Sequence, residues 1–410
     1  MNVPEITVNT IGCGLRVLHI YVPGAAVSWC GVAVDVGSRD DPADRHGLAH
    51  FVEHTIFKGT THRRAWHILN RMERVGGELN AFTTKDTTML YSVFPANHLS
   101  RAIELIADMV RYSTFPTVEV ERERDVVAEE IASYRDTPAE AAYDDIEDMV
   151  FAGSPLGHNI LGDTEALSRC EAQHCKDFLK RLYTPRSMVL FVMGPQRESV
   201  VMRQAERLFG TMDHERAPFI ERAFPAVNPP ERKVESLGLH QAHTVMAARL
   251  PGRHHESRFA LMLLSNILGG PGMNSMLNIE LRERRGYVYT VETSVNMFDD
   301  CGLWQLYFGC EQDNVKRATT HVEHILSRMA EHELSEKQSD AYKRQYCGQL
   351  IVADASAEGR VMNAARSVLH YGTHSSVDCV TERIMDVTPT MIRDVATMLS
   401  PASLSSITLL

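Results

Sequence analysis

The sequence predicts an α+β protein built from two homologous domains, each with an antiparallel-rich mixed sheet that is covered by helices. Three observations lead to this prediction. The chain has 410 residues, which exceeds one ordinary core and suits two domains of about 200 residues. Its composition, 44% hydrophobic and 23% charged, is that of a globular protein. A pattern of helices and strands in the first half also recurs about 215 residues later.

The repeat begins with a helix that stops at a glycine and runs into a hairpin. In the first half, residues 71–77 end a helical pattern, and strand patterns follow at 78–82 and 88–94. The corresponding segments of the second half are 281–286, 287–291 and 303–308. Both halves therefore contain a helix, a glycine stop and an antiparallel hairpin in the same order.

Two helical patterns follow each hairpin, and each half closes with a helix and a buried strand. The paired helices are 99–112 with 118–134 and 315–331 with 335–351. The closing segments are 178–185 with 189–192 and 395–401 with 407–410. Between the halves lies 217–234, which is rich in proline and charge and has little periodicity. The predicted division is an N-terminal domain at 1–216, a linker at 217–234 and a C-terminal domain at 235–410.

Charge, apolar runs and cysteines exclude several classes of function. The formal net charge of −11 disfavours nucleic-acid binding, which requires a basic face. The longest apolar stretch, 188–193, is far shorter than the roughly 20 residues that cross a bilayer, and the N-terminal residues do not form a secretory signal. The eight cysteines include no CxxC pair, so we expect reduced thiols. These features predict a cytoplasmic protein, although a chain whose signal had been removed would look the same.

The strongest functional signal is the HxxEH segment that runs from His50 to His54. Residues four apart on an α-helix share one face, so His50 and His54 can bind the same ion. Glu53 precedes His54 and can act as the general base on a zinc-bound water. The alternative is a surface helix with spare histidines, since the chain has 19 of them. The apolar flanks favour the metal site, because buried imidazoles without partners are costly.

A catalytic zinc commonly has three protein ligands, so a third donor must come from another segment. In the acidic segment 120–131, Glu123 and Glu130 lie seven residues apart on one helix face, whereas Glu129 points about 100° away. We therefore predict Glu130 as the third ligand and Glu123 as the residue that orients the histidines. Taken alone, an acidic helix is usually only a solvated surface.

These segments resemble the pitrilysin-like inverzincin metallopeptidases, in particular the mitochondrial-processing-peptidase type and its short bacterial members. The resemblance covers 47–60, 76–81, 121–130, 155–162, 268–273 and 281–291, in that order along the chain. It implies a zinc-dependent endopeptidase that hydrolyses peptides or unfolded precursor segments. It also implies Zn²⁺ held by His50, His54 and Glu130, with Glu53 as the base and Glu123 behind the ligands. The roles implied by the family agree with those derived from the helix faces.

The resemblance further implies two catalytic residues in the second half. Arg282 and Tyr289 are similar to an Arg–Tyr pair that holds the substrate carbonyl and stabilises the oxyanion. Without the resemblance, they would be read as a surface charge and an ordinary strand residue. We interpret the glycine-rich segment 269–272 as a turn or a flexible loop that contacts substrate, because it lacks the Lys and Ser/Thr of a phosphate-binding loop.

A substrate-binding strand is also implied by the family. Asn80, Ala81 and Phe82 are similar to an edge strand on which the peptide adds as a further strand. The alternative is an ordinary hairpin strand. We expect the turn that follows, residues 83–86, to be exposed.

The second half has no histidines at the positions equivalent to His50 and His54, since 259–264 is entirely apolar. We therefore expect metal in the first domain only. In short members of the family, two chains pair as a clamshell dimer, and the partner supplies the Arg–Tyr pair. Because this chain contains both sets of residues, we expect a homodimer with active sites completed in trans. A heterodimer is the alternative.

Three functions fit the sequence to different degrees. A zinc endopeptidase accounts for every motif. A non-catalytic scaffolding subunit, as some relatives are, would show a broken metal set or a lost base. A zinc hydrolase with a non-peptide substrate is opposed by the implied peptide-binding strand.

Overall fold

The computed structural model describes residues 5–212, 222 and 225–410, and it divides the chain into two compact units. The first unit combines Met1–Ala132, His158–Glu221 and Asp354–Ser376. The second unit combines Ser133–Gly157, Arg222–Ala353 and Val377–Leu410. Both units therefore include a segment from the opposite half of the sequence.

The first unit contains a six-stranded mixed sheet in the order β1-β2-β6-β3-β5-β4. Its strands are β1 (Glu5–Thr10), β2 (Arg16–Tyr21), β3 (Val27–Val34), β4 (Glu78–Thr83), β5 (Thr88–Pro95) and β6 (Met188–Gly194). Neighbouring strands are antiparallel except for β2 and β6, which are parallel. All seven residues of β6 are buried, as expected for a central strand with helices on both faces. The strand β4 lies at one edge.

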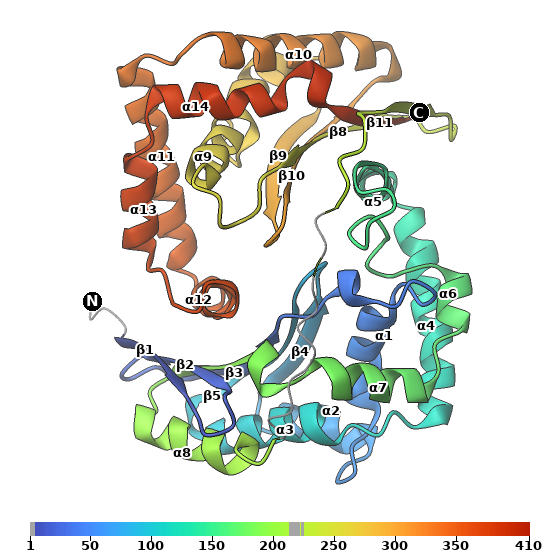
Figure 1. Cartoon of the computed structure of the whole chain (residues 1–410), viewed down its shortest axis with the longest axis vertical. Coiled ribbons are helices and arrows are strands. Elements are labelled where there is room, and N and C mark those ends of the chain that lie inside the picture. The colour runs from blue at the N-terminus through green and yellow to red at the C-terminus, as the bar shows by residue number, and fades with distance from the viewer. Residues whose placement is uncertain (1–4, 213–221, 223–224) are drawn as a thin grey trace. The chain divides into compact units, whose positions relative to one another are not determined.

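Helices cover both faces of this sheet (Figure 1). One apolar core joins inward-facing residues of β2 and β3, such as Val17 and Val32, to the helices α1, α3, α7 and α8. The opposite face, with Leu18 and Ala33, packs against α12. The helices of this unit are α1 (Leu48–Thr55), α2 (Ala65–Glu73), α3 (Leu99–Tyr112), α4 (Thr117–Arg135), α6 (Thr164–Ser168), α7 (Ala172–Leu182), α8 (Glu198–Phe209) and α12 (Ala357–Tyr371), the end of α4 passing into the second unit.

The second unit contains a five-stranded mixed sheet in the order β7-β11-β8-β10-β9. Its strands are β7 (Arg232–Glu235), β8 (Ala242–Leu250), β9 (Thr290–Met297), β10 (Gly302–Cys310) and β11 (Ser405–Leu409), and only β7 and β11 pair in parallel. Its helices are α5 (Pro138–Val150), α9 (Arg258–Gly269), α10 (Val315–Glu331), α11 (Glu336–Asp354), α13 (Val377–Met385) and α14 (Pro389–Ala396). One face of the sheet packs on α5, and the other packs on α9, α10 and α14.

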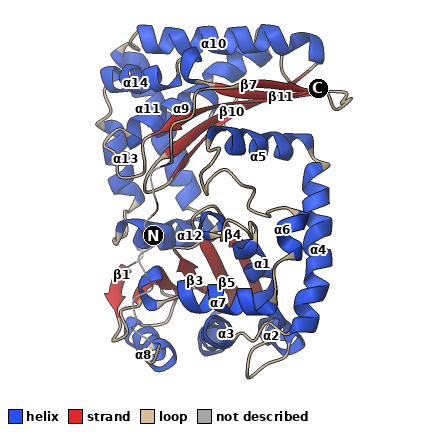
Figure 2. Cartoon of the chain, turned by 45° about the vertical axis from the view of Figure 1, so that its right-hand side comes forward, coloured by secondary structure: helices blue, strands red, loops and turns tan. Residues whose placement is uncertain are grey.

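The two units repeat one arrangement of elements, and the chain therefore has the two α+β domains that the sequence predicts. The strands β6, β3, β5 and β4 of the first sheet occupy the same order as β11, β8, β10 and β9 of the second. The long helices α4 and α11 both have 19 residues. The colouring by secondary structure in Figure 2 shows a sheet with covering helices in each unit.

The helices α5 and α12 are exchanged between the two halves of the sequence. α5 follows α4 in the first half, yet its buried residues Ala142 and Ile146 pack with Val245 of the second sheet. α12 follows α11 in the second half and packs Val361 and Ala365 on the first sheet. The compact units therefore differ from the predicted linear division at 217–234. An amphipathic pattern shows that a helix buries one face but does not identify the sheet it covers.

Three local expectations need correction. The predicted linker includes a strand, since β7 begins at Arg232 and pairs with β11; residues 217–221, 223 and 224 of the linker lie outside the described residues. The strand expected at 287–291 begins later, at Thr290. The turn at 83–86 is not exposed: Lys85 and Asp86 are 6% and 7% accessible, and the Lys85 ammonium donates to the carbonyl of His158 at 2.5 Å.

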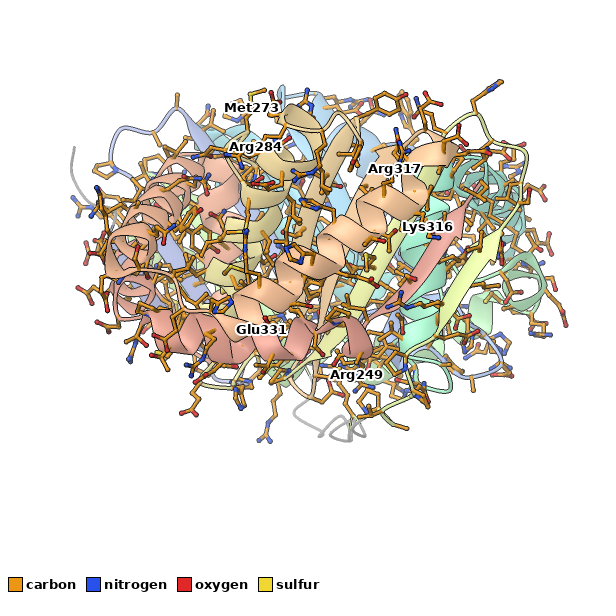
Figure 3. All side chains as sticks on the ribbon, turned by 90° about the horizontal axis from the view of Figure 1, so that it is seen from above. Arg249, Met273, Arg284, Lys316, Arg317 and Glu331 are labelled. Atoms are coloured by element: carbon orange, nitrogen blue, oxygen red, sulfur yellow. The ribbon has the colours of Figure 1, made fainter. Side chains whose placement is uncertain are left out.

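Helix α10 shows how packing outweighs local charge in this fold. Lys316 and Arg317 lie in its first turn and Glu331 at its last residue, as labelled in Figure 3. The basic first turn opposes the helix dipole, which favours acidic residues at the start of a helix, and the last turn contains Arg328 as well as Glu331. The helix is held instead by a buried stripe on its other face, formed by Ala318, Val322, Ile325, Leu326 and Met329. Across the described residues, no helix is both long and apolar enough to cross a membrane.

Candidate metal centre

The helix α1 is fixed at its start by a buried carboxylate. The Asp41 side chain is fully buried and accepts hydrogen bonds from the backbone N–H groups of Gly47 and Ala49, both at 2.7 Å. These are donors that a helix leaves unpaired in its first turn, and an acidic group is favourable there. Phe51 and Val52, which belong to α1, are completely buried. The short helix is therefore held in a single orientation.

His50, His54 and Glu130 lie together in the first unit. The two imidazole rings on α1 are 4.6 Å apart between centroids. Oε2 of Glu130, on α4, is 3.9 Å from Nε2 of His50 and 3.4 Å from Nε2 of His54. One ligand atom from each residue falls within 4.8 Å of the others, which is close enough for all three to hold one metal ion.

The donor set fits zinc. Two imidazole nitrogens and one carboxylate oxygen make a set of three protein ligands that leaves a coordination position open. Burial, together with neighbouring His54, lowers the pKa of His50 to about 3, so this imidazole is neutral at physiological pH, as a metal ligand must be. The buried Nδ1 atom of His50 has no hydrogen-bond partner among the described residues.

Glu123 lies behind His54 and joins it to a lysine. Its Oε1 is 3.0 Å from Nδ1 of His54, and its Oε2 is 2.6 Å from the ammonium of Lys58. Burial acts to raise the pKa of Glu123, but the hydrogen bonds from His54 and Lys58 outweigh it and lower the pKa. A carboxylate on Nδ1 leaves Nε2 directed at Glu130, which fixes the tautomer required of a ligand.

The carboxyl group of Glu53 lies beside the ligands but points toward the sheet. Its Oε2 accepts a hydrogen bond of 2.9 Å from the hydroxyl of Thr83, the last residue of β4. Burial raises the pKa of Glu53, and the Thr83 hydrogen bond and the charge of His54 oppose this rise. A raised pKa suits a residue that takes up and returns a proton near neutral pH.

The helix-face reasoning for α4 can be compared with the observed burial. Glu123 is buried, Glu130 is partly buried and Glu129 is exposed. The structure therefore directs Glu123 and Glu130 to the same side of α4 and turns Glu129 to solvent.

The predicted substrate residues occupy two different units. Asn80, Ala81 and Phe82 lie on β4, the edge strand of the first sheet. Arg282 belongs to a π-helical segment, η5 (Asn278–Glu283), in the second unit, and Tyr289 immediately precedes β9. Both side chains are accessible to solvent, and the Tyr289 hydroxyl donates to a carboxylate oxygen of Glu311.

Sequence reasoning missed Asp41, Lys58 and Thr83. Lys58 follows α1 by three residues, in the 3-10 helix η2 (Ile56–Lys58), and reads as an ordinary surface lysine. Thr83 could have been found from the alternation of β4, because Ala81 and Thr83 must face the same side. The acidic residue six positions before Gly47 carried a weak capping signal.

The corresponding helices of the second unit are joined by an amide hydrogen bond. Counted from the first residue of each long helix, Gln349 takes the place of Glu130 (130 − 117 = 349 − 336 = 13). Its side-chain carbonyl accepts a hydrogen bond of 2.8 Å from the amide of Asn266 on α9. An amide pair therefore links α9 to α11 where the first unit places its candidate ligands.

Comparison with known proteins identifies the family. Residues 16–164 match the family model described as Insulinase (Peptidase family M16), and residues 169–346 match the Peptidase M16 inactive domain. An uncharacterized zinc protease of Mycobacterium tuberculosis is 34% identical over 391 residues, which cover 95% of this chain and 89% of the relative. The chain belongs to peptidase family M16. This confirms the resemblance to short bacterial members of the pitrilysin-like peptidases.

A further relative is also named as a zinc protease, and two solved structures have the same fold. An uncharacterized zinc protease of Bacillus subtilis is 28% identical, with 89% of this chain and 88% of the relative covered. A protease from Helicobacter pylori has the same fold, with a TM-score of 0.92 over the whole of both chains at 20% identity. A protein from Pseudomonas fluorescens, described as a peptidase M16 inactive domain, has a TM-score of 0.90 at 17% identity, covering 99% of this chain and 97% of that one. The predicted two-domain α+β fold with mixed sheets is confirmed.

Proposed function

We propose that this M16 member is a zinc-dependent endopeptidase whose zinc is held by His50, His54 and Glu130. The convergence of these three side chains beside the carboxyl group of Glu53 is the observation that carries the proposal. A zinc ion at this position would supply Lewis acidity, lowering the pKa of a bound water toward about 7 and polarising the scissile carbonyl. The names of its relatives as zinc proteases support this choice of metal.

Glu53 is the general base in this proposal. It takes a proton from the water that attacks the scissile carbonyl and returns it to the amine nitrogen of the leaving peptide. Glu123 holds His54 in the tautomer that presents Nε2 to the metal. Arg282 and Tyr289 are donors suited to stabilising the oxyanion that forms on the substrate carbonyl.

The substrate in this proposal is an extended or unfolded peptide. Among the described residues, no other strand pairs with the outer edge of β4, so a peptide can add there as a further strand. Pairing of this kind makes few demands on side chains, which suits an endopeptidase that accepts varied peptides.

The experiment compares the wild type with E53Q on a mixture of internally quenched peptides. We expect E53Q to lose at least about a hundredfold in kcat/KM while retaining one zinc per chain by atomic emission. E129Q, which changes an exposed glutamate on the same helix, is the matched control and should keep wild-type activity. Equal cleavage by E53Q and the wild type would rule out Glu53 as the base. A wild type that binds zinc but cleaves no peptide would favour a non-peptide substrate or a scaffolding role.

We also propose that two copies of the chain form a homodimer and complete each other's active sites. One chain carries both the metal residues and Arg282 with Tyr289, so a second kind of chain is not required. E53Q and R282A, each inactive alone, should recover activity when they are mixed, because one of the mixed sites then has both intact sets. Absence of recovery in a mixture shown by light scattering to be dimeric would contradict the arrangement in trans.

A further inference from the structure

The strand β4 turns its odd-numbered residues toward α1. Leu79 and Ala81 pack in the core that contains α1, whereas Phe82 packs in the core on the opposite face, with α12. Thr83 has the parity of Leu79 and Ala81 and therefore also faces α1. Its hydroxyl is 2.9 Å from Oε2 of Glu53. The last residue of the edge strand is thus in direct contact with the proposed base.

Thr83 is the donor in its hydrogen bond with Glu53, as the neighbouring hydrogen bonds indicate. Thr83 pairs with Thr88 across the hairpin, and their hydroxyl oxygens are 3.4 Å apart. The Thr88 hydroxyl donates to the carbonyl of Val36 at 2.9 Å. Because each hydroxyl has one proton, the Thr83 proton is free to go to Glu53, an acceptor when ionised. The neighbouring Thr88 and the pleat of the strand hold the Thr83 hydroxyl in place.

We propose that Thr83 is a positioning residue for Glu53. Its hydroxyl donates a hydrogen bond to Oε2 of the carboxylate. The other oxygen, Oε1, is thereby held in a fixed orientation toward the attacking water. Among the described residues, Oε1 accepts no hydrogen bond. This inference rests on the function proposed above and adds a role for a side chain on the strand that borders the substrate.

The location of Thr83 gives this contact a consequence for catalysis. A peptide that adds to β4 would pair with the backbone of the same strand whose final side chain holds the base. The position of the substrate backbone and the orientation of the base are therefore set by one rigid element. Losing the hydroxyl should leave the binding edge intact and release the carboxylate, which affects kcat more than KM.

The experiment compares T83V, which keeps the shape of the side chain, with T83S, which keeps the hydroxyl. We expect T83V to lower kcat about ten- to hundredfold, the effect of one hydrogen bond to a charged group, with KM changed less than about threefold. T83S should recover most of the loss, and both variants should bind one zinc. T7V is the matched control, because Thr7 lies on β1, the opposite edge strand, and its hydroxyl has no hydrogen-bond partner in the part of the chain that the structure describes.

Other outcomes would overturn the proposal. T83V with the kcat of T7V would show that the hydroxyl has no role. A loss of zinc, or a rise in KM alone, would show that Thr83 supports the metal site or the binding edge instead. T83S as slow as T83V would show that the hydroxyl is not the active feature. T83A replaces T83V in each comparison if the valine variant fails to fold.

A second measurement separates this inference from the proposed function. In metal-free protein, the urea midpoints of the wild type, T83V, E53A and the double variant form a double-mutant cycle. We expect T83V to lower the midpoint in the wild-type background and to have a smaller effect when Glu53 is absent. Additive effects would show that the two side chains are not coupled and would overturn the inference, whether or not the protein cleaves peptides. Inactivity of the wild type, with a coupled cycle, would contradict the proposed function alone.

Discussion

Replacing Glu123 by glutamine should weaken zinc binding without unfolding the protein. The substitution keeps the shape of the side chain but removes its charge, between Nδ1 of His54 at 3.0 Å and the ammonium of Lys58 at 2.6 Å. If the amide oxygen of the glutamine accepts the hydrogen bond from His54, the NH₂ group faces the ammonium of Lys58. Both groups are donors, so no hydrogen bond can form between them. If the amide is reversed, two donors meet at His54 instead. Glutamine therefore cannot satisfy both neighbours.

The size of the effect follows from these contacts. Loss of the partner behind a ligating histidine typically weakens metal binding about 10- to 100-fold. This corresponds to roughly 1.4–2.7 kcal/mol. The Lys58 side chain is 27% exposed and can turn toward water, which relieves one of the two unsatisfied contacts. We therefore expect the lower part of this range, about 10- to 30-fold.

Competition with a chromogenic chelator measures the zinc dissociation constants of the wild type, E123Q and E129Q. E129Q controls for removing one negative charge from α4, because Glu129 is exposed on the same helix. E130Q, which alters a proposed ligand, should bind zinc more weakly than E123Q. If E123Q binds zinc as tightly as E129Q does, the carboxylate behind His54 has no part in zinc binding, and the reasoning is wrong.

Two further predictions concern the first unit. Gly47 has a φ of 91°, and a Cβ there would lie 2.4 Å from the carbonyl oxygen of Leu161, whereas Gly76 has a φ of 75° with open space around it. G47A should therefore lower the urea-derived stability by about 1–3 kcal/mol more than G76A, and equal losses would show that the loop at Leu161 yields freely. Burial lowers the pKa of His19 in the folded protein. Below about pH 6.5, His19 therefore binds a proton more readily in the unfolded chain than in the folded protein, and the free energy of unfolding falls. Between pH 7 and 5, metal-free wild type should lose more stability than H19Q, by up to about 1.4 kcal/mol per pH unit, and parallel curves would contradict this.

Much of the fold could be predicted because its elements leave local signatures. The hairpin of β4 and β5 follows a glycine stop, and the buried strand β6 is a continuous apolar run. The order of elements could be predicted because the same order of patterns occurs in both halves of the sequence. The exchange of α5 and α12 could not, since both are ordinary amphipathic helices and the choice of sheet depends on contacts far away in sequence.

In the candidate site too, some residues could be predicted from local sequence patterns and others could not. His50, Glu53 and His54 are visible from helical spacing alone, and Glu130 follows from the need for a third ligand on a helix face. The sequence predicts that Lys85 and Asp86 are exposed, because a charged turn normally faces water, but both side chains are buried. Lys85 is instead held by the carbonyl of His158, a contact between segments 73 residues apart that no local pattern encodes.

Zinc would also stabilise the last part of α4 that belongs to the first unit. The boundary between the units falls after Ala132, two residues beyond Glu130, so a metal joining Glu130 to His50 and His54 would tie α4 to α1 just before the chain leaves. In the second half, the boundary falls after Ala353, four residues beyond Gln349, and the amide pair of Gln349 and Asn266 makes the corresponding tie.

The two ties should respond differently to removal of metal. A chelator would remove the metal link between Glu130 and α1, while the hydrogen bond of Glu123 to His54 and the amide link between α11 and α9 do not depend on an ion. We therefore expect amide hydrogen exchange to speed up near Glu130 and to stay unchanged near Gln349 when zinc is removed, since local opening follows the loss of local contacts. Equal changes in the two helices would mean that zinc stabilises the protein globally, and the pairing of a metal tie with an amide tie would then have no local consequence.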